Sequence, residues 1–307
     1  MSIRASLFHF TLKNRHLLKG QLRADIITKD TSIEKLRAET DAAAERLIKG
    51  QRDIQFENAV FPNFYSEWVI PQNAPEDKII LYFHGGGFVM GNARSHRNLV
   101  STFVKALGLK ALVFDYSLAP EHPSPAAVND SYSIYKWLLE DGFQAENIAF
   151  AGDSAGAGIL LSTLLKCKDE KTPLPAACLA FSPCTDMTMS GESHISRKKY
   201  DPCTPEGANE TYLSYYVGEG DPRHPYASPL FGDLTNLPPI HIEVGNDETL
   251  RDDSVLFCQK AKEAGSPVSI NVWKGMFHCF SLMAPMFPEA TQSLDQSCDF
   301  LRTQLNI

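Results

Sequence analysis

The sequence predicts an α/β protein in which a mostly parallel central sheet is flanked by helices. From about residue 64 onward, short apolar runs alternate with stretches of helical periodicity, and this alternation is typical of right-handed βαβ units. The apolar runs are unbroken, as expected for strands that are buried on both faces. The length of 307 residues suits one large α/β unit.

The strands and helices that we expect follow from this alternation. The clearest apolar runs predict strands at Ile79–Phe83, Ala111–Phe114, Ile148–Ala151, Ala177–Phe181, Ile240–Val244 and Ile270–Trp273. The helical stretches between and after them lie near residues 95–107, 127–141, 155–168, 250–264 and 286–304.

Two segments stand outside the alternation. Residues 1–49 read as helices: Ile3, Leu7 and Phe10 share one face of the first, and a second is expected to begin with Thr31 as its N-cap. This helix pair either packs on the core for stability or roofs a pocket. Residues 186–230 are polar and rich in proline, without a clear strand, which favours an insertion folded over the active end of the sheet.

Composition excludes several classes of function. The net charge of −8, from 37 acidic and 29 basic residues, argues against nucleic-acid binding and does not favour an anionic membrane surface. No apolar run is long enough to span a bilayer, and no cleavable signal segment is evident. The seven cysteines include no C-x-x-C pair, which indicates free thiols and a reducing compartment. We therefore expect a cytoplasmic protein without a metal.

A candidate nucleophile lies at Ser154. The segment Gly152-Asp153-Ser154-Ala155-Gly156 matches G-x-S-x-G, directly after an expected strand and directly before an expected helix. That context is typical of a nucleophile elbow, a sharp turn that needs small neighbours and exposes the serine. The following helix would direct backbone N–H groups at the reacting centre. The alternative is a glycine-rich turn with a passive serine.

A second glycine-rich segment, His84-Gly85-Gly86-Gly87, follows another expected strand. Three glycines allow the backbone to approach a ligand closely and to present N–H groups to it. A phosphate-binding loop is the alternative, but neither of the glycine-rich phosphate motifs is present. His84 itself is expected to fix the loop by hydrogen bonding rather than to act as a base.

A nucleophilic serine needs a base, and the base needs an acid to orient it. Among the nine histidines, His278 is the one in a turn after a late strand. The acids that follow the preceding strand are Asp247, Glu248, Asp252 and Asp253. We favour Asp247, because it comes first after the strand; Asp252 and Asp253 fall in the next helix and are expected to be surface or capping charges.

Together these motifs closely resemble the hormone-sensitive-lipase-like family of bacterial esterases and acetyl hydrolases, within the α/β-hydrolase superfamily. The resemblance covers nearly the whole chain from residue 64 onward. It rests on His84-Gly85-Gly86-Gly87-Phe88, Asp115-Tyr116-Ser117-Leu118-Ala119-Pro120-Glu121, Gly152-Asp153-Ser154-Ala155-Gly156, Asp247-Glu248-Thr249-Leu250-Arg251-Asp252 and Gly275-Met276-Phe277-His278.

The resemblance implies an α/β-hydrolase fold with a helical cap, made of residues 1–49 and the insertion 186–230, over a catalytic core of residues 50–185 and 231–307. It implies a triad of Ser154, Asp247 and His278 and a substrate close to Phe88. The implied oxyanion-hole residues are Ala155 and two of the three glycines Gly85, Gly86 and Gly87.

The function predicted from the sequence is a carboxylesterase for short- to medium-chain acyl esters that needs no cofactor. A lactone hydrolase and an N-acetyl or amide deacetylase would use the same triad, so the motifs do not separate them. A receptor without catalysis on this fold is disfavoured, because His278 is present. A small-molecule ester is the expected partner, without nucleic acid or stable membrane insertion, and a homodimer is compatible with the sequence.

Overall fold

The computed structural model describes residues 1–18, 26–47 and 53–307. The expected boundary between the N-terminal helices and the core, at residues 49 and 50, lies outside these described residues. None of the helices in the described part of the chain is long and apolar enough to cross a membrane.

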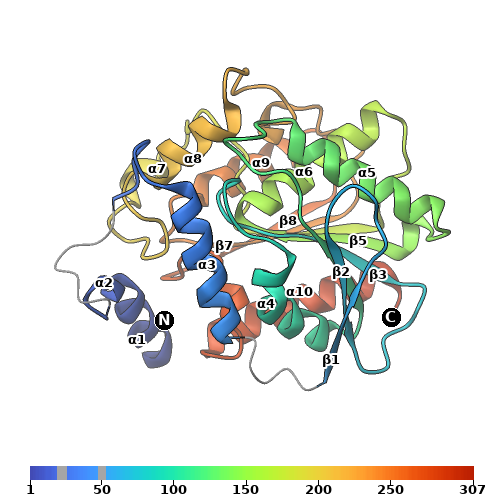
Figure 1. The fold of residues 1–307 in the computed structure, drawn as a ribbon, viewed down its shortest axis with the longest axis horizontal. Helices are drawn as coiled ribbons and strands as arrows, with labels where there is room; N and C mark the ends of the chain where they lie inside the picture. Colours follow the sequence, from blue (N-terminus) through green and yellow to red (C-terminus); the bar gives the residue numbers. More distant parts are fainter. Residues whose placement is uncertain (19–25, 48–52) are drawn as a thin grey trace.

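The fold is built on an eight-stranded sheet with the order β1-β2-β4-β3-β5-β6-β7-β8 (Figure 1). From β4 to β8 the neighbouring strands are parallel, whereas β1 and β2 are antiparallel at one edge. The strands are β1 (Ile54–Asn58), β2 (Ser66–Pro71), β3 (Ile79–Phe83), β4 (Lys110–Phe114), β5 (Ile148–Asp153), β6 (Ala177–Phe181), β7 (Ile240–Gly245) and β8 (Val268–Trp273).

The predicted parallel sheet is confirmed, because all six expected apolar runs are strands β3 to β8. Strands β1 and β2 are additions that the sequence analysis did not identify. The exposed and buried positions of β1 are mixed, as is usual for a strand at a sheet edge, so its sequence lacks the continuous apolar run that marks the central strands.

Helices cover both faces of the sheet. Helices α4 and α10 pack on one face, and α5, α6 and α9 cover the other. Alternating side chains of each strand supply the two cores: in β3, Leu81 and Phe83 belong to the α6 side, while Ile80 and Tyr82 belong to the α4 side. These helices are α4 (Ala93–Leu107), α5 (Ala126–Glu140), α6 (Ser154–Asp169), α9 (Arg251–Glu263) and α10 (Pro288–Leu305).

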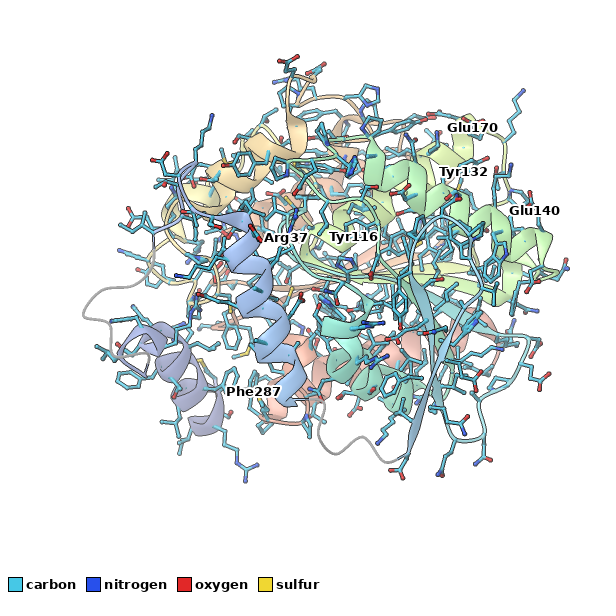
Figure 2. All side chains as sticks on the ribbon, in the orientation of Figure 1. Arg37, Tyr116, Tyr132, Glu140, Glu170 and Phe287 are labelled. Atoms are coloured by element: carbon cyan, nitrogen blue, oxygen red, sulfur yellow. The ribbon has the colours of Figure 1, made fainter. Side chains whose placement is uncertain are left out.

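Three helices precede the sheet: α1 (Ile3–Lys13), α2 (Arg15–Leu18) and α3 (Ile33–Leu47). Thr31 is not the N-cap of α3, as the sequence had suggested; Ser32 Oγ accepts a hydrogen bond from the backbone N–H of Lys35 at 3.2 Å. Helix α3 lies against the body of the molecule, with Arg37 and Tyr116 close together (Figure 2).

Residues 186–230 contain two helices, α7 (Ser193–Ser196) and α8 (Ala208–Val217). Helix α8 contacts the loop that follows β3: the ring of Tyr216 is stacked on Phe88, with centroids 3.8 Å apart. A Cβ atom on Gly87 would come within 2.6 Å of the Tyr212 ring. The insertion therefore lies against the glycine-rich loop at the carboxyl end of the parallel strands.

Candidate active site

Ser154 lies at the sharp turn between β5 and α6. Its φ of 54° is in the left-handed region, which a side chain adopts at an energetic cost and which is common where function requires it. The turn is crowded: a Cβ atom on Gly156 would approach the Phe83 carbonyl oxygen to 2.2 Å, so only glycine fits there. The small residues of the motif thus have a steric cause.

His278 reaches Ser154 from the loop after β8. Its Nε2 atom lies 2.9 Å from Ser154 Oγ, a hydrogen-bond distance at which the imidazole can accept the hydroxyl proton. Met276 and Phe277 are fully buried just before it, and the Met276 carbonyl accepts a bond from the Asp247 N–H at 2.9 Å. The loop that carries His278 is therefore fixed to the loop after β7.

The acid beside His278 is Glu248, and the expectation that Asp247 lies there is corrected by the geometry. Oε2 of Glu248 is 3.5 Å from Nδ1 of His278. Asp247 instead faces Arg197 at 3.7 Å and accepts a hydrogen bond from the Asn246 side chain at 2.9 Å. The backbone of the loop after β7 decides which of two adjacent carboxylates points inward, and the acid's position in the sequence does not reveal that direction.

Glu248 is held in a buried environment. Its side chain is completely buried, and Oε2 accepts a hydrogen bond from Ser182 Oγ at 2.9 Å. Burial raises the pKa of Glu248, although the contact with His278 opposes this shift. Burial lowers the pKa of His278, but Cys279 and Glu248 outweigh that effect and raise the pKa well above its ordinary value.

Hydrogen bonds to the carboxylate of Asp153 hold the glycine-rich loop in place. Oδ1 of this carboxylate accepts hydrogen bonds from the Gly85 N–H at 3.1 Å and from the Tyr82 hydroxyl at 2.9 Å. Because the Gly85 N–H is used inside the protein, Gly85 does not suit the role of oxyanion donor. Gly86 and Gly87, with φ of 128° and 61°, remain the candidates from this loop.

His84 fixes the loop, as expected, and is not a base. Its Nδ1 donates to the Gly85 carbonyl oxygen at 2.9 Å, and its ring is stacked on Tyr116 with centroids 4.1 Å apart. Burial lowers the pKa of His84 to about 3. The imidazole is therefore neutral at physiological pH.

Phe88 was expected beside the substrate. Its side chain is 2% exposed, and its ring packs on Tyr216 of α8. Tyr212, one helical turn before Tyr216, is only partly buried and lies over Gly87. Tyr212, which the sequence analysis did not single out, is thus a partly exposed aromatic side chain next to the glycine-rich loop. Contact between Phe88 and substrate stays a prediction.

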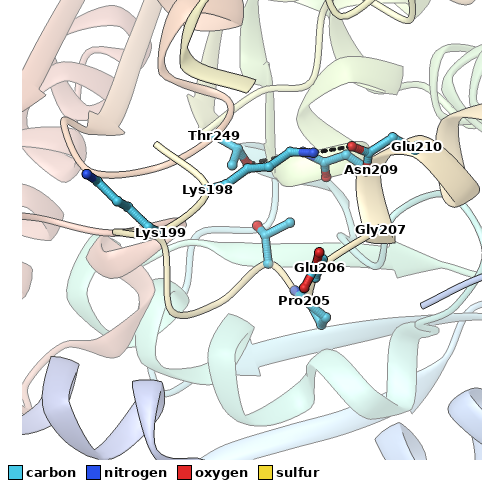
Figure 3. Close-up of a pocket in the computed structure, with 9 residues that line it drawn as sticks. Lys198, Lys199, Pro205, Glu206, Gly207, Asn209, Glu210 and Thr249 are labelled. Carbon is cyan, nitrogen blue, oxygen red and sulfur yellow. Dashed lines mark hydrogen bonds and ion pairs between the residues drawn. The ribbon is translucent and has the colours of Figure 1, made fainter. Parts of the chain in front are cut away.

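A pocket of about 270 Å³ is lined by residues of the insertion and by Thr249 (Figure 3). Its lining residues are Lys198, Lys199, Thr204, Pro205, Glu206, Gly207, Asn209, Glu210 and Thr249. Thr249 directly follows Glu248, and the pocket floor is tied to it because Asp201 Oδ2 accepts bonds from the Thr249 N–H at 3.2 Å and from Thr204 Oγ1 at 2.8 Å. The pocket therefore adjoins Glu248 on the side of the insertion.

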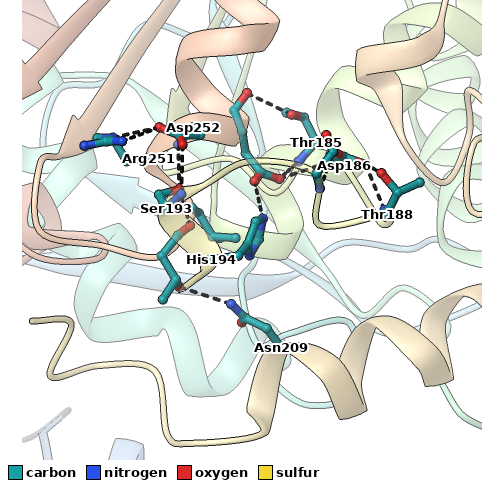
Figure 4. Close-up of polar contacts among 12 residues, drawn as sticks. Thr185, Asp186, Thr188, Ser193, His194, Asn209, Arg251 and Asp252 are labelled. Carbon is teal, nitrogen blue, oxygen red and sulfur yellow. Dashed lines mark hydrogen bonds and ion pairs between the residues drawn. The ribbon is translucent and has the colours of Figure 1, made fainter. Parts of the chain in front are cut away.

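Asp252 and Asp253 were expected to be surface or capping charges, and both bond to the insertion. Figure 4 shows Asp252 beside Ser193, the first residue of α7. Asp252 accepts a hydrogen bond from the Ser193 N–H at 2.8 Å. Asp253 is 1% exposed; it binds His194 Nε2 at 2.7 Å and the Thr185 N–H at 2.8 Å. The acids after Glu248 thus hold the insertion on α9.

Cys279 is the thiol nearest to the catalytic groups. Its Sγ lies 3.5 Å from His278 Nε2, and its N–H donates to Ser182 Oγ at 3.1 Å. Burial raises the pKa of Cys279, although His278 opposes the shift. Within residues 1–18, 26–47 and 53–307, no group of three or more His, Cys, Asp or Glu side chains could hold a metal ion.

Comparison with known proteins gives a consistent picture. A family model for the alpha/beta hydrolase fold matches residues 80–282, which include Ser154, Glu248 and His278. The acetyl-hydrolase of Streptomyces hygroscopicus is 40% identical over 238 residues, which cover 78% of this chain and 79% of the relative.

Solved structures are similar over the full chain. The crystal structure of EstE5 soaked with p-nitrophenyl butyrate has 36% sequence identity and a TM-score of 0.91, with 100% of both chains covered. An esterase from the bacterial hormone-sensitive lipase family has 34% identity and a TM-score of 0.90, with 99% of both chains covered.

Proposed function

Because this chain belongs to the alpha/beta hydrolase fold family and to its hormone-sensitive-lipase-like esterases, we propose that it hydrolyses short- to medium-chain acyl esters through Ser154, His278 and Glu248. The observation that carries this proposal is the 2.9 Å contact between Ser154 Oγ and His278 Nε2 at a strained strand-to-helix turn. A serine so placed is activated by the adjacent base.

In the first half of the reaction, neutral His278 accepts the proton of Ser154 as Oγ attacks the ester carbonyl carbon. The resulting imidazolium lies next to the Glu248 carboxylate, which stabilises its charge and keeps Nδ1 as the protonated nitrogen. His278 then donates its proton to the leaving alcohol. The product of this half is an acyl group bound to Ser154 Oγ.

In the second half, His278 accepts a proton from water as the water oxygen attacks the acyl carbonyl carbon. The bond between this carbon and Ser154 Oγ then breaks, His278 returns the proton to Oγ, and the carboxylic acid leaves. The tetrahedral intermediates of both halves carry an oxyanion. We assign its donors to the N–H groups of Gly86, Gly87 and Ala155, because Ala155 lies in the first turn of α6, where backbone N–H groups lack partners within the helix. Gly85 is left out, since its N–H binds Asp153.

The names of the relatives favour small acyl groups. One is an acetyl-hydrolase, and crystals of another were soaked with a butyrate ester. The close approach of Tyr212 to Gly87 supports this assignment, because an aromatic ring above the glycine loop limits the length of acyl chain that fits beside it.

Covalent labelling tests the nucleophile. Phenylmethylsulfonyl fluoride should inactivate the enzyme, and peptide mapping should find the adduct on Ser154. Ser154→Ala and His278→Ala should each lower kcat for p-nitrophenyl acetate by roughly four to six orders of magnitude, since these residues act as a unit. A label on another residue, with Ser154→Ala fully active, would refute the proposal.

A panel of substrates identifies the class of bond that the enzyme cleaves. Lactones and N-acetyl amides react through the same triad, so we propose esters and test all three classes side by side. p-Nitrophenyl esters from acetate to decanoate should give the highest kcat/KM at the short end. A higher kcat/KM for a lactone or an N-acetyl amide than for any ester would change the substrate class and leave the triad in place.

A further inference from the structure

Helix α1 carries apolar side chains on two opposite faces, and one of these faces is covered by the protein. On the covered face, Ala5 is fully buried and Phe8 packs against two aromatic rings. Its centroid lies 5.9 Å from that of Phe277 and 5.5 Å from that of Phe287. This face accounts for the position of the helix on the molecule.

The opposite face is open. Ile3, Leu7 and Phe10 are 89%, 66% and 64% exposed, and we call these three side chains the α1 stripe. At about 100° per residue, they lie within an arc of roughly 60°. Apolar side chains that cluster on an exposed face, with polar residues around them, are typical of a contact with a membrane or another protein. The α1 stripe is therefore a candidate docking face.

The charged side chains of α1 itself have one sign. The first 24 residues contain five lysines and arginines and no acid, in a chain whose net charge is −8. Arg4 and Lys13 are both exposed and lie about 80–100° to either side of the stripe. Lys13 Nζ donates to the Lys199 carbonyl at 3.3 Å, which brings the exposed Lys199 to the same region.

Two of the acids near α1 are paired, whereas Glu206 and Asp295 are exposed beside it. Glu289 accepts a hydrogen bond from Ser2 Oγ at 2.8 Å and lies 3.9 Å from the amino terminus, and Glu210 pairs with Lys198. The exposed face of α1 therefore carries the apolar α1 stripe with a cationic side chain on either side of it.

We propose that α1 is a docking element for an anionic lipid surface, on which it lies parallel to the plane with Ile3, Leu7 and Phe10 among the acyl chains. Helices of this kind place apolar side chains below the headgroups and basic side chains at the level of the lipid phosphates. Figure 1 shows α1 at the outer edge of the molecule, where the stripe can meet a plane. Its 11 residues are too few to span a bilayer.

A second copy of the chain is a poorer occupant. In a two-fold dimer the same patch lies on both sides of the interface, so Arg4 and Lys13 would face the same cations of the partner. Like charges at such a distance oppose association. An anionic lipid surface offers acyl chains to the α1 stripe and phosphates to Arg4 and Lys13.

The docking helix is next to the proposed catalytic loop. Phe8 and His9 both pack on Phe277, and Phe277 directly precedes His278. Docking would therefore bring the loop of the base close to the lipid surface. This consequence rests on the proposed function, whereas the docking itself does not.

The experiment is co-sedimentation of the full chain with vesicles of phosphatidylcholine alone and of phosphatidylcholine mixed with phosphatidylglycerol. We expect binding to the anionic vesicles that weakens as salt is added. The double variant Leu7→Gln/Phe10→Gln should lose roughly tenfold or more in the partition constant, because its apolar contact is removed. Arg4→Gln/Lys13→Gln should lose the preference for anionic over neutral vesicles.

Two controls separate docking from general effects. Val60→Gln changes a side chain that is 90% exposed in the loop between β1 and β2, and it should bind vesicles like the wild type. All these variants should hydrolyse p-nitrophenyl acetate in solution at the same rate. If the wild type did not hydrolyse this ester, the proposed function would be refuted and the docking proposal would be unaffected.

Three results would overturn the docking proposal. One is that the wild type binds neither kind of vesicle. Another is that Leu7→Gln/Phe10→Gln binds anionic vesicles as well as the wild type does. The third is that this variant changes a dimer into a monomer in sedimentation velocity while vesicle binding is unchanged, which would assign the α1 stripe to a second copy.

Discussion

Oε2 of Glu248 lies 3.5 Å from Nδ1 of His278, while the carboxylate of the preceding residue, Asp247, faces Arg197. Two adjacent acids thus point in different directions, and one of them is placed to stabilise a protonated His278.

Replacing each of these two carboxylates by its amide tests the assignment of Glu248 as the triad acid. We expect Glu248→Gln to lower kcat by about three to four orders of magnitude, as loss of the triad acid does in other serine hydrolases. Asp247→Asn should change kcat by no more than about threefold, because a half-exposed ion pair contributes little. Steady-state kinetics with p-nitrophenyl acetate measures both, and thermal unfolding shows whether each variant is folded. A larger loss for Asp247→Asn would return the role to Asp247.

The pH dependence of kcat/KM follows from the environment of His278. The base must be neutral, and contacts with Cys279 and Glu248 raise the pKa of His278 above its ordinary value despite its burial. Activity should therefore be low at acidic pH and should rise through a midpoint above that of a free histidine, about 6.5. A midpoint clearly below that value in the wild type would contradict the geometry.

The same measurement on a variant gives a second check. Glu248→Gln removes a negative charge beside Nδ1, so the residual activity should rise through a lower pH than in the wild type. An unchanged midpoint would show that Glu248 does not interact with the titrating group.

Cys279 offers a test of crowding near the base. Its thiol is 3.5 Å from His278 Nε2 but has no part in the proposed chemistry, so Cys279→Ala should keep kcat within about threefold of the wild type. The adduct of Cys279 with N-ethylmaleimide would block the approach to Ser154. Because the thiolate is the reactive form and burial raises the pKa of Cys279, inactivation of the wild type should be slow at neutral pH and faster as the pH rises, whereas Cys279→Ala should stay active. Equal inactivation of both proteins would place the sensitive thiol elsewhere among the seven cysteines.

The sequence predicted most of the fold because a buried parallel strand leaves an unbroken apolar run, as Ile79–Phe83 and Ala177–Phe181 do. Ser154 and His278 were also predictable, since their loops follow such strands. The antiparallel strand Ile54–Asn58 was not, because Ile54 is its one buried residue and the other four are partly or fully exposed.

Side-chain direction is the part of the site that the sequence could not supply. Asp247 and Glu248 are neighbours with equivalent chemistry, and only the path of the backbone after β7 turns Glu248 toward His278. The face of α1 was similarly ambiguous: Ile3, Leu7 and Phe10 share a side, as predicted, but the structure buries Ala5 and leaves that side exposed. The negative net charge of the whole chain also gave no indication of the local excess of cations in the first 24 residues.

Arg37 connects the N-terminal part of the chain to the glycine-rich loop. From α3, its Nε donates to the Val89 carbonyl at 2.7 Å and its Nη2 to the Ala119 carbonyl at 3.0 Å. It also forms two 2.8 Å bonds with Glu121, which lower the pKa of that carboxyl to about 2. One side chain therefore fixes two loops near the proposed oxyanion site.

We expect Arg37→Ala to lower kcat by about tenfold with little change in KM. The loop from Gly86 to Gly91 contains several residues in left-handed conformations, and without the bond to Val89 it should hold its N–H donors less firmly, which weakens stabilisation of the oxyanion. Arg37→Lys should recover only part of kcat, because an ammonium cannot replace the planar fork of the guanidinium. Lys35→Ala is the matched control, since Lys35 lies on the same helix and forms an exposed pair with Glu39 at 3.9 Å. If Arg37→Ala lowered the melting temperature and left kcat unchanged, α3 would be a structural support without influence on the oxyanion loop.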